Sequence, residues 1–504
     1  MNSFASVVKA VASNFYGWCG ANNAYFVGLS RWLDEKLDGS IVEIRCSLLT
    51  KQLINNLMAI SLEGKERFLT QIYVNACITI AEIMYESGLS LEISPELTQA
   101  MQDVLTVLSG RILLYTPLDC LLIMREMDSA ITEEDEQQAT DLLLFLSAHP
   151  SYYRVQADKL AAAAIFYCSY EDNPAIRDGI VLGKGKYLYT LSQTVDTIQG
   201  MIEELVQVAG WIPSLYAKAP LDKPSVTRHY LYDDDVVGTA SKPSLKDNLI
   251  IITDDSLGSG SYGQVFRAKA NTAYIAVKIQ DDPEVAIREL ILMCSLTHAN
   301  VQSARSFSFQ GNLTLIHMPI QQSLHDLIYS SHTFEEAYAL HDQVWIDGLA
   351  SPFRVLDMVS RRSYARQLLQ GLVYLADMRI VHGDIKPSNL LVTSSGVLKI
   401  ADYGMAIVYS PSLDFAKDSE VVLYGSYYRD PNIRKPSKRF SFEADVYASG
   451  ISLLEMEVSI VPYFQTIGIN FGCIRDRHFR TVCTQMLARD IYSRVSAEQA
   501  LAAF

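Results

Sequence analysis

Residues 382–391 read HGDIKPSNLL, and this stretch decides how the rest of the chain is interpreted. It places an aspartate, a lysine and an asparagine, Asp384, Lys386 and Asn389, within one short segment. Carboxylate and amide oxygens suit a hard divalent cation, and a lysine ammonium suits a phosphate anion. Between the histidine and the aspartate stands Gly383, which offers no side chain. The segment groups residue types that metal and phosphate chemistry uses, and the remaining sequence must show which role they have.

The composition limits the classes of protein that this chain can represent. With 504 residues, 49% of them hydrophobic and 20% charged, it is expected to form two or three globular domains. A formal charge of -15 disfavours nucleic acid as a partner, because phosphate backbones are bound by clustered Lys and Arg. No apolar run reaches the length of about 18 residues that a membrane span requires. We therefore expect a soluble intracellular protein that binds no membrane.

The chain divides into two halves with different periodicity. Residues 1–215 repeat apolar positions every three or four residues, which predicts an all-α domain with a central, alanine-rich helix near 156–170. Thr132, followed by Glu133, Glu134 and Asp135, marks a helix start. Residues 216–248 hold three prolines and an acidic triplet and are predicted to form a linker. From residue 249 short β-branched runs precede helical patterns, so 249–504 is predicted to be an α+β domain.

Further positions join the quoted loop at spacings that carry chemistry. A glycine-rich turn between two strand-like runs lets backbone amides approach phosphates, although such a turn alone could be a tight hairpin. A lysine follows in a third strand-like run, a glutamate able to pair with it follows in a helical run, and an aspartate follows the quoted loop. In order, these residues are Gly258, Gly260, Gly263, Lys278, Glu289 and Asp402.

Together these residues resemble the signature set of eukaryotic protein kinases, in the correct order over 249–504. The resemblance implies a bilobal kinase domain and gives four residues catalytic roles. By it, Asp384 accepts or orients the substrate hydroxyl proton, and Lys386 steadies the transferred phosphoryl group. Lys278 pairs with Glu289 and meets the nucleotide phosphates.

The same resemblance implies two cofactors, ATP and Mg²⁺. Asn389 and Asp402 correspond to the residues that hold the metal. The residues at His317, Met318 and Pro319 align with the hinge that receives adenine, where a histidine is unusual. The full set implied to bind ATP is Leu257, Gly258, Gly260, Gly263, Val265, Ala276, Lys278, His317, Met318, Pro319 and Leu391.

A narrower likeness gives the first half a meaning. Pro283–Glu289 resembles the regulatory helix of cyclin-dependent kinases, which a bound cyclin holds in place in that family. Tyr115–Leu122 and 154–167 resemble parts of a cyclin box, so we expect a cyclin-like domain in the same chain and a monomer. An unrelated helical domain is the alternative. A lysine and a glutamate typical of cyclins fall on Met84 and Gln102, so apolar packing would have to carry the contact.

Gly383 bears on regulation, because kinases with an arginine at this position use it to grip a phosphate on the activation loop. Asp418 falls where the phosphorylated threonine would stand, and one exposed carboxylate alone would not order the loop. We therefore expect activity without loop phosphorylation. The alternative is that Ser419 is phosphorylated and read by Arg362 or Arg366.

Two departures from the kinase pattern concern residues that support the predicted active site. Asp430-Pro431-Asn432 stands where the family has Ala-Pro-Glu, so the ion pair to Arg494 is expected to become a neutral hydrogen bond at best. Only ten residues separate Lys278 from Glu289, and this short connection is expected to hold the helix inward by itself.

The sequence thus predicts a Ser/Thr protein kinase that acts on protein substrates and is activated by its own cyclin-like domain. Arg429 suggests a preference for proline after the target residue. Ser261 and Tyr262 match positions at which cyclin-dependent kinases are inhibited by phosphorylation, or the tyrosine packs over the phosphate loop. The competing interpretations are a pseudokinase or scaffold, and a kinase inhibited by residues 1–215. One-chain fusions of this kind resemble products of large DNA viruses, which would place the protein in a host cell.

Overall fold

The structure is a computed structural model of the chain, and it divides into two compact units. One is formed by residues up to Ser244 and the other mainly by residues from Leu245 onward. The residues that the structure describes are 30, 33, 41–59, 71–85, 93–112, 116–169, 191–209, 249–260, 263–270, 273–329, 356–408, 428–430, 441–458 and 476–504.

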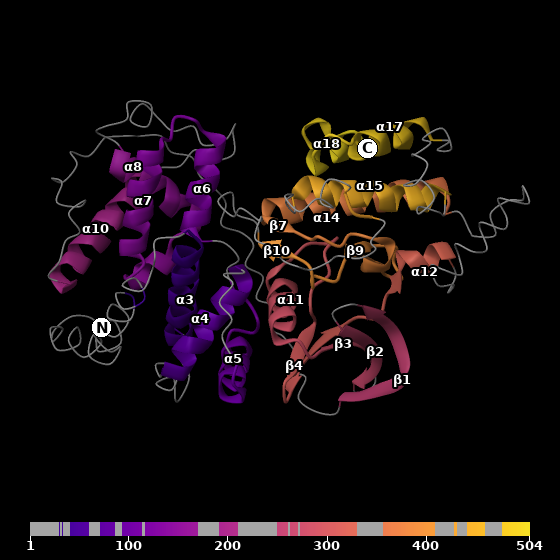
Figure 1. The fold of residues 1–504 in the computed structure, drawn as a ribbon, viewed down its shortest axis with the longest axis horizontal. Helices are drawn as coiled ribbons and strands as arrows, with labels where there is room; N and C mark the ends of the chain where they lie inside the picture. Colours follow the sequence, from indigo (N-terminus) through magenta and orange to yellow (C-terminus); the bar gives the residue numbers. More distant parts are fainter. Residues whose placement is uncertain are drawn as a thin grey trace, which may run out of the picture. The chain divides into compact units, whose positions relative to one another are not determined.

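The first unit is all-α in its described residues (Figure 1). At its centre α8 packs against α6, α7 and α10, and the side chains from Leu160 to Ile165 are fully buried. Alanines let neighbouring helices approach closely, so the central position of this helix follows from its sequence. The elements are α3 (Ile41–Ala59), α4 (Gln71–Tyr85), α5 (Pro95–Val107), α6 (Pro117–Met127), α7 (Glu133–Leu146), η2 (Pro150–Arg154), α8 (Ala157–Ser169) and α10 (Leu191–Ala209).

Helix starts in this unit follow the expected capping chemistry. Thr132 caps α7, where its hydroxyl accepts the Asp135 amide and the Asp135 carboxylate accepts the Thr132 amide at 2.9 Å. This confirms the predicted helix start. Thr116 and Asp119 form the same reciprocal box at the start of α6.

A buried charge pair crosses the first unit. Arg45 on α3 lies 2.6 Å from Asp119 on α6, and the two side chains are 0% and 4% exposed. The Arg45 guanidinium also lies over the Tyr85 ring, 4.0 Å from its centroid. Asp119 accepts the Thr116 amide and hydroxyl at 2.7 and 2.8 Å. One carboxylate therefore caps a helix and balances a buried cation.

The second unit has a sheet lobe and a helical lobe (Figure 1). Its five-stranded antiparallel sheet has the order β1-β2-β3-β5-β4, and α11 packs against β3 and β5. The elements of this lobe are β1 (Leu249–Gly260), β2 (Gly263–Ala270), β3 (Ala273–Gln280), α11 (Pro283–Ser295), β4 (Ser306–Gln310) and β5 (Leu313–Met318).

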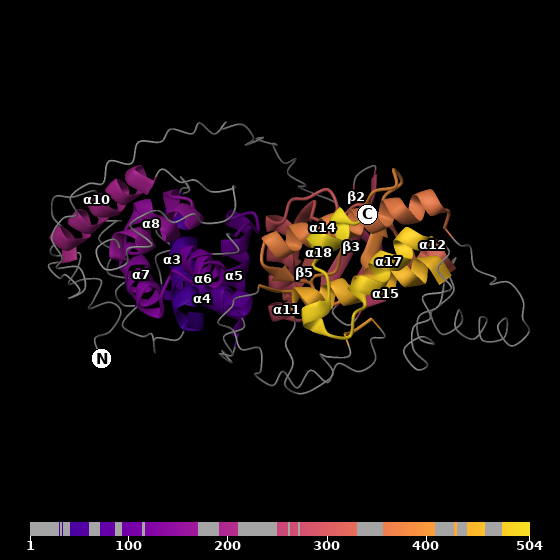
Figure 2. The ribbon, with the colours of Figure 1, turned by 90° about the horizontal axis from the view of Figure 1, so that it is seen from above.

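In the helical lobe α14 packs against α15 and α18, and α17 packs against α15 and α18 (Figure 2). Short strands at the edge of this lobe carry the loops that the sequence singled out. The all-α first unit and the α+β second unit confirm the expected fold class, whereas the likeness to a cyclin box stays a prediction. The elements are β6 (Gln322–Ser323), α12 (Leu324–Tyr329), α14 (Met358–Asp377), β7 (Ile380–Val381), η4 (Pro387–Asn389), β8 (Leu390–Val392), β9 (Leu398–Ile400), β10 (Ile407–Val408), α15 (Phe442–Val458), α17 (Arg477–Met486), η6 (Ile491–Ser493) and α18 (Ala497–Ala502).

Within the described ranges, every helix is too short, too charged or too polar to cross a bilayer.

Replacing Asp119 with asparagine is expected to lower the free energy of unfolding of the first unit by about 3–5 kcal/mol, because Arg45 would stay buried without a counter-charge. Heat- or urea-induced unfolding of the full chain, followed by circular dichroism, measures this change. Glu134→Gln, at an exposed position of α7, is the matched control and should change the value by less than about 0.5 kcal/mol. A loss no larger than that of the control would contradict the prediction.

Candidate active site

Lys278 on β3 and Glu289 on α11 form a buried ion pair. The Lys278 ammonium lies 2.9 Å from Oε1 and 2.8 Å from Oε2 of Glu289, and the residues are 5% and 1% exposed. The helix starts soon after the strand ends at Gln280, because the Asp282 carboxylate caps it and Pro283 suits its first position. The structure therefore brings together the two residues whose spacing predicted the pair.

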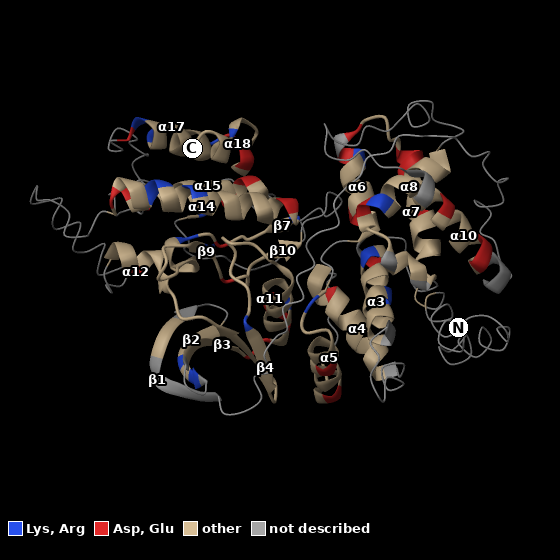
Figure 3. Cartoon of the chain, turned by 180° about the vertical axis from the view of Figure 1, so that it is seen from behind, with Lys and Arg blue, Asp and Glu red and all other residues tan. Residues whose placement is uncertain are grey.

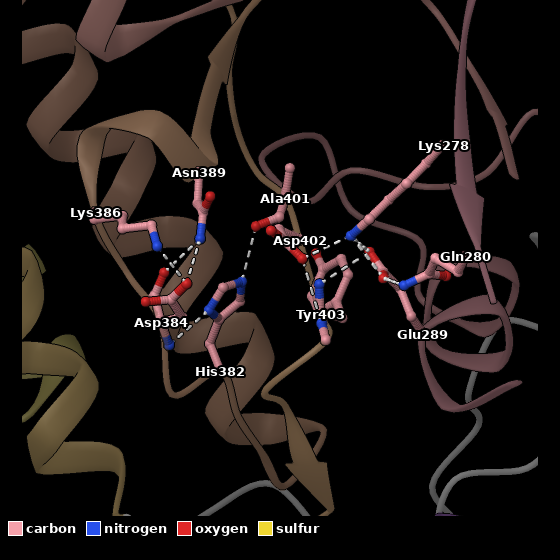
Figure 4. Close-up of polar contacts among 11 residues, drawn as sticks. Lys278, Gln280, Glu289, His382, Asp384, Lys386, Asn389, Ala401, Asp402 and Tyr403 are labelled. Atoms are coloured by element: carbon pink, nitrogen blue, oxygen red, sulfur yellow. Dashed lines mark hydrogen bonds and ion pairs between the residues drawn. The ribbon is translucent and has the colours of Figure 1, made fainter. Parts of the chain in front are cut away.

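The same lysine also contacts Asp402, whose Oδ1 lies 2.7 Å from the ammonium (Figure 4). Burial acts to lower the pKa of Lys278, but the two carboxylates raise it overall. Burial raises the pKa of Glu289, although Lys278 opposes this effect. Burial also acts to raise the pKa of Asp402, yet Lys278 holds it below its usual value. One cation thus balances two carboxylates, which leaves negative charge at Asp402 for a further cation.

The catalytic-loop residues converge on Asp384. Lys386 donates to Asp384 Oδ2 at 2.7 Å, and the Asn389 amide donates to the carbonyl and to Oδ2 of Asp384 at 2.8 and 2.9 Å. These bonds fix the carboxylate orientation and place a cation beside it (Figure 4). The structure therefore brings together Asp384, Lys386 and Asn389, as their spacing in the sequence predicts.

Asp445 on α15 holds the backbone of the catalytic loop at His382 and Gly383. Its carboxylate accepts the His382 amide at 2.6 Å and the Gly383 amide at 2.9 Å. Burial raises the pKa of Asp445 to about 7, while the two amides lower it. Gly383 has φ 78°, a conformation that costs a residue with a side chain about 1 kcal/mol or more. The backbone itself therefore favours glycine at this position.

His382 and Tyr403 join the loop to the segment that bears Asp402. The His382 ring meets Ala401 O at 3.0 Å and lies edge-on to Tyr403, with ring centroids 5.2 Å apart. Burial lowers the pKa of His382, so its imidazole is neutral at pH 7. The Tyr403 hydroxyl donates to Ile400 O at 2.9 Å, which satisfies the polar atom that distinguishes it from phenylalanine.

Three of the residues expected to bind ATP share one face of the sheet. Strand register places Val265 opposite Lys278, and Ala276 stands two residues before that lysine, so their side chains point to the same side. Met318 pairs with Ala276 from β5, and Pro319 follows it at an exposed position. These residues line up along the strands next to Lys278.

Gly263, the last glycine of the glycine-rich segment, lies close to the backbone of β3. Gly260 pairs with Gly263, and Leu257 and Gly258 are exposed on β1. Gly263 has φ 147°, and a Cβ there would lie 2.7 Å from Ile279 O. Only glycine allows this close approach of the turn to the strand.

His317 is not brought to the same face as Lys278. It pairs with Val277, whose side chain points away from the lysine face, and its two ring nitrogens lie 3.0 and 3.2 Å from the hydroxyls of Ser306 and Ser308 on β4. Burial lowers the pKa of His317, which is therefore neutral at pH 7. The unusual histidine thus ties β5 to β4, and its proposed contact with ATP has no support from this register.

The donor set near Asp402 fits Mg²⁺. Asn389 uses its amide nitrogen on Asp384, which leaves its amide oxygen for a cation, and Asp402 offers a carboxylate. Mg²⁺ takes one or two carboxylates and completes its shell with water and substrate phosphates. Among the described residues no group of three or more His, Cys, Asp or Glu side chains is placed so that it could hold a metal ion by itself. Leu391 lies on β8, two residues after Asn389.

The expectation that Arg494 lacks an anionic partner is wrong. Its guanidinium lies 2.5 Å from the carboxylate of Asp430, and both side chains are 0% exposed. Arg494 also donates to Glu443 O at 2.8 Å and to Ala488 O, and it lies over the Tyr447 ring. Asp430 stands at the alanine position of the kinase pattern, so the carboxylate has moved two residues upstream and the ion pair is kept.

Three arginines lie on α14, at 361, 362 and 366 (Figure 3). Arg362 Nε donates to Asp476, the residue that caps α17, at 2.7 Å. This pairing disfavours Arg362 as the reader of a phosphate on the activation loop. Several predicted features lie outside the described residues: 216–248, Ser261, Tyr262, Asp418, Ser419, Pro431 and Asn432.

The comparisons with known proteins agree with this geometry. A family model described as "Protein kinase domain" matches residues 251–503. The chain is 30% identical over 210 residues to "Cyclin-dependent kinase 17" of Caenorhabditis elegans, covering 40% of this chain and 28% of that protein.

Fungal kinases are similar as well. The "Serine/threonine-protein kinase SSN3" of Aspergillus oryzae is 30% identical over 243 residues, covering 45% of this chain and 54% of that protein. The protein of the same name from Coccidioides immitis is 29% identical over 241 residues, covering 45% and 48%. The chain thus spans about half, or less, of the length of the curated relatives it matches.

Removing the Asp430–Arg494 ion pair tests how much it contributes to the stability of the helical lobe. Asp430→Asn is expected to lower the free energy of unfolding by about 3–5 kcal/mol, because Arg494 would remain buried without a counter-charge. The double variant Asp430→Leu with Arg494→Met should lose less than the sum of the two single changes, as measured by thermal unfolding. Arg362→Met, which removes a half-exposed arginine from its pair with Asp476, is the control and should cost about 1 kcal/mol or less. Strict additivity would show that the pair is not formed.

Proposed function

The chain belongs to the protein kinase domain family, and from that premise we propose that it is a Ser/Thr protein kinase of the cyclin-dependent type. It would transfer the γ-phosphate of ATP to hydroxyl groups of protein substrates. The observation that carries this proposal is the buried Lys278–Glu289 pair beside Asp402, next to the Asp384–Lys386–Asn389 cluster. Each residue needed for phosphoryl transfer stands in a contact that suits its role.

The proposed chemistry relies mainly on orientation and charge. Asp384, held by Asn389, would orient the substrate hydroxyl and take its proton, and Lys386 beside it would balance the charge on the transferred group. Lys278 would hold the nucleotide phosphates. Bound Mg²⁺ would neutralise charge on the phosphates from its site at Asp402 and Asn389.

A transfer assay tests this activity. Purified full-length protein with labelled ATP, Mg²⁺ and a mixture of peptide substrates should label serine or threonine, and chelation of the metal should abolish the signal. Asp402→Asn is expected to reduce the rate roughly 10²- to 10⁴-fold, because one metal-holding carboxylate is lost. Asp281→Asn, the same change at an exposed position of the β3–α11 connection, should leave the rate unchanged. A wild-type protein without transfer would favour the pseudokinase or scaffold.

We further propose that the helical first unit acts as a cyclin-like activator in cis. Two features support this: Pro283–Glu289 resembles the cyclin-bound helix, and a similar protein is named a cyclin-dependent kinase. If residues 216–248 tether the units, their r.m.s. span is about 30 Å and the effective concentration is roughly millimolar. Any interface with a tighter intrinsic affinity would then stay formed.

We also propose that the activation loop needs no phosphate. Gly383 carries no side chain that could read one, and Arg362 is engaged with Asp476. Unphosphorylated protein from a bacterial host should therefore be active. An inactive protein that a loop-phosphorylating kinase rescues would support the alternative at Ser419.

Cleavage of the predicted linker tests whether residues 1–215 activate or inhibit the kinase domain. A protease site inserted within 216–248 allows activity to be measured before cleavage, after cleavage at nanomolar concentration, and after reconcentration. Activation in cis predicts that activity falls on dilution after the cut and returns when the halves are concentrated. A rise after cleavage would mean that residues 1–215 inhibit the kinase. An uncut sample diluted in parallel is the control.

A further inference from the structure

Gln280 is a buried polar residue that the kinase pattern does not include. It is the last residue of β3, two positions after Lys278, so the two side chains point to the same face of the sheet. Its exposed fraction is 2%, and its amide nitrogen donates to Glu289 Oε2 at 2.6 Å. Figure 4 shows the Gln280 amide and the Lys278 ammonium both reaching the Glu289 carboxylate.

The donors to Glu289 form two sets. Lys278 contacts Oε1 at 2.9 Å and Oε2 at 2.8 Å. The second set is independent of the lysine: the Tyr403 backbone amide donates to Oε1 at 3.3 Å, and Gln280 donates to Oε2 at 2.6 Å. Each carboxylate oxygen of Glu289 therefore keeps one hydrogen-bond donor if Lys278 leaves it to bind another anion.

Lys278 has such competing anions. It already shares its ammonium with Asp402 at 2.7 Å, and under the proposed function it must also hold nucleotide phosphates. A buried carboxylate that loses its cation is costly unless neutral donors remain. The second set of donors meets this need at Glu289.

Gln280 also touches the phosphate loop. A Cβ on Gly263 would lie 2.9 Å from Gln280 Cγ and 3.4 Å from Lys278 Cε. The stem of Gln280 therefore packs directly beneath the last glycine of the turn, while its amide reaches α11. One side chain joins the loop, the strand and the helix.

We propose that Gln280 is a positioning residue that holds Glu289, and with it α11, in the inward position independently of Lys278. This inference rests on the proposed kinase function and adds a residue to its machinery. It explains how a lysine shared among three anions can leave the helix in place.

The first test removes the donor in the full-length protein. Gln280→Leu keeps a similar volume and is expected to reduce kcat/KM for ATP roughly 10- to 100-fold, the range for a lost hydrogen bond to a charged group. Gln310→Leu, the same change at the exposed end of β4, is the control and should have no effect. Equal activity of the two variants would overturn the proposal.

The second test uses a pH profile, which a purely structural role would not shift. Gln280→Glu places a carboxyl group against Glu289, with Lys278 and Asp402 as the other charged groups facing it. One proton shared between the two carboxyls restores the donor, so the activity optimum should move to lower pH than in the wild type. An unshifted profile would contradict a hydrogen bond at this site.

The third test does not need activity. Thermal unfolding of Gln280→Leu, Glu289→Leu and the double variant should show coupling, because each change removes the same contact. Additive losses would overturn the Gln280 proposal. A wild-type protein that transfers no phosphate, but shows this coupling, would overturn the kinase function and leave the positioning contact intact.

Discussion

A carboxylate as deeply buried as that of Glu289 must be met by a cation or by hydrogen-bond donors, and the second unit is arranged around this requirement. Lys278, Gln280 and the Tyr403 amide all turn toward it. Because these groups come from β3 and from the segment after Asp402, satisfying one carboxylate fixes α11 against the sheet and the sheet against that segment. The geometry around Lys278 and Asp402 follows from this demand.

The helical lobe uses buried carboxyl groups and an arginine in the same way. Asp445 fixes the catalytic loop through two backbone amides, and Glu455 accepts the Tyr428 hydroxyl at 2.5 Å. Arg494 holds Asp430 at 2.5 Å. In each case a buried side chain of the helical lobe holds a residue of an irregular segment. Asp445 does so through backbone amides, and Glu455 and Arg494 do so through side chains.

The sequence predicts those parts of the site that depend on spacing. The order of the motifs is enough to place Lys278 against Glu289 and to gather the catalytic loop, and capping residues locate helix starts. Contacts between side chains far apart in the chain are different. The bond from Arg494 to Asp430 spans 64 positions, and that of His317 depends on strand register. A motif carries no information about such packing, although a polar residue two positions after Lys278, on a face expected to be buried, was a signal for Gln280.

Gly383 raises one question about backbone conformation and another about regulation. Its positive φ and the bond from its amide to Asp445 explain why glycine suits the backbone, but they do not explain how a kinase manages without an arginine there. The described end of the activation segment offers part of an answer. Tyr428 and Asp430 are both held by buried groups of the helical lobe, Glu455 and Arg494, and neither contact involves a phosphate. These contacts hold the C-terminal end of the segment through side chains of the helical lobe, which supports the proposal that the loop needs no phosphate.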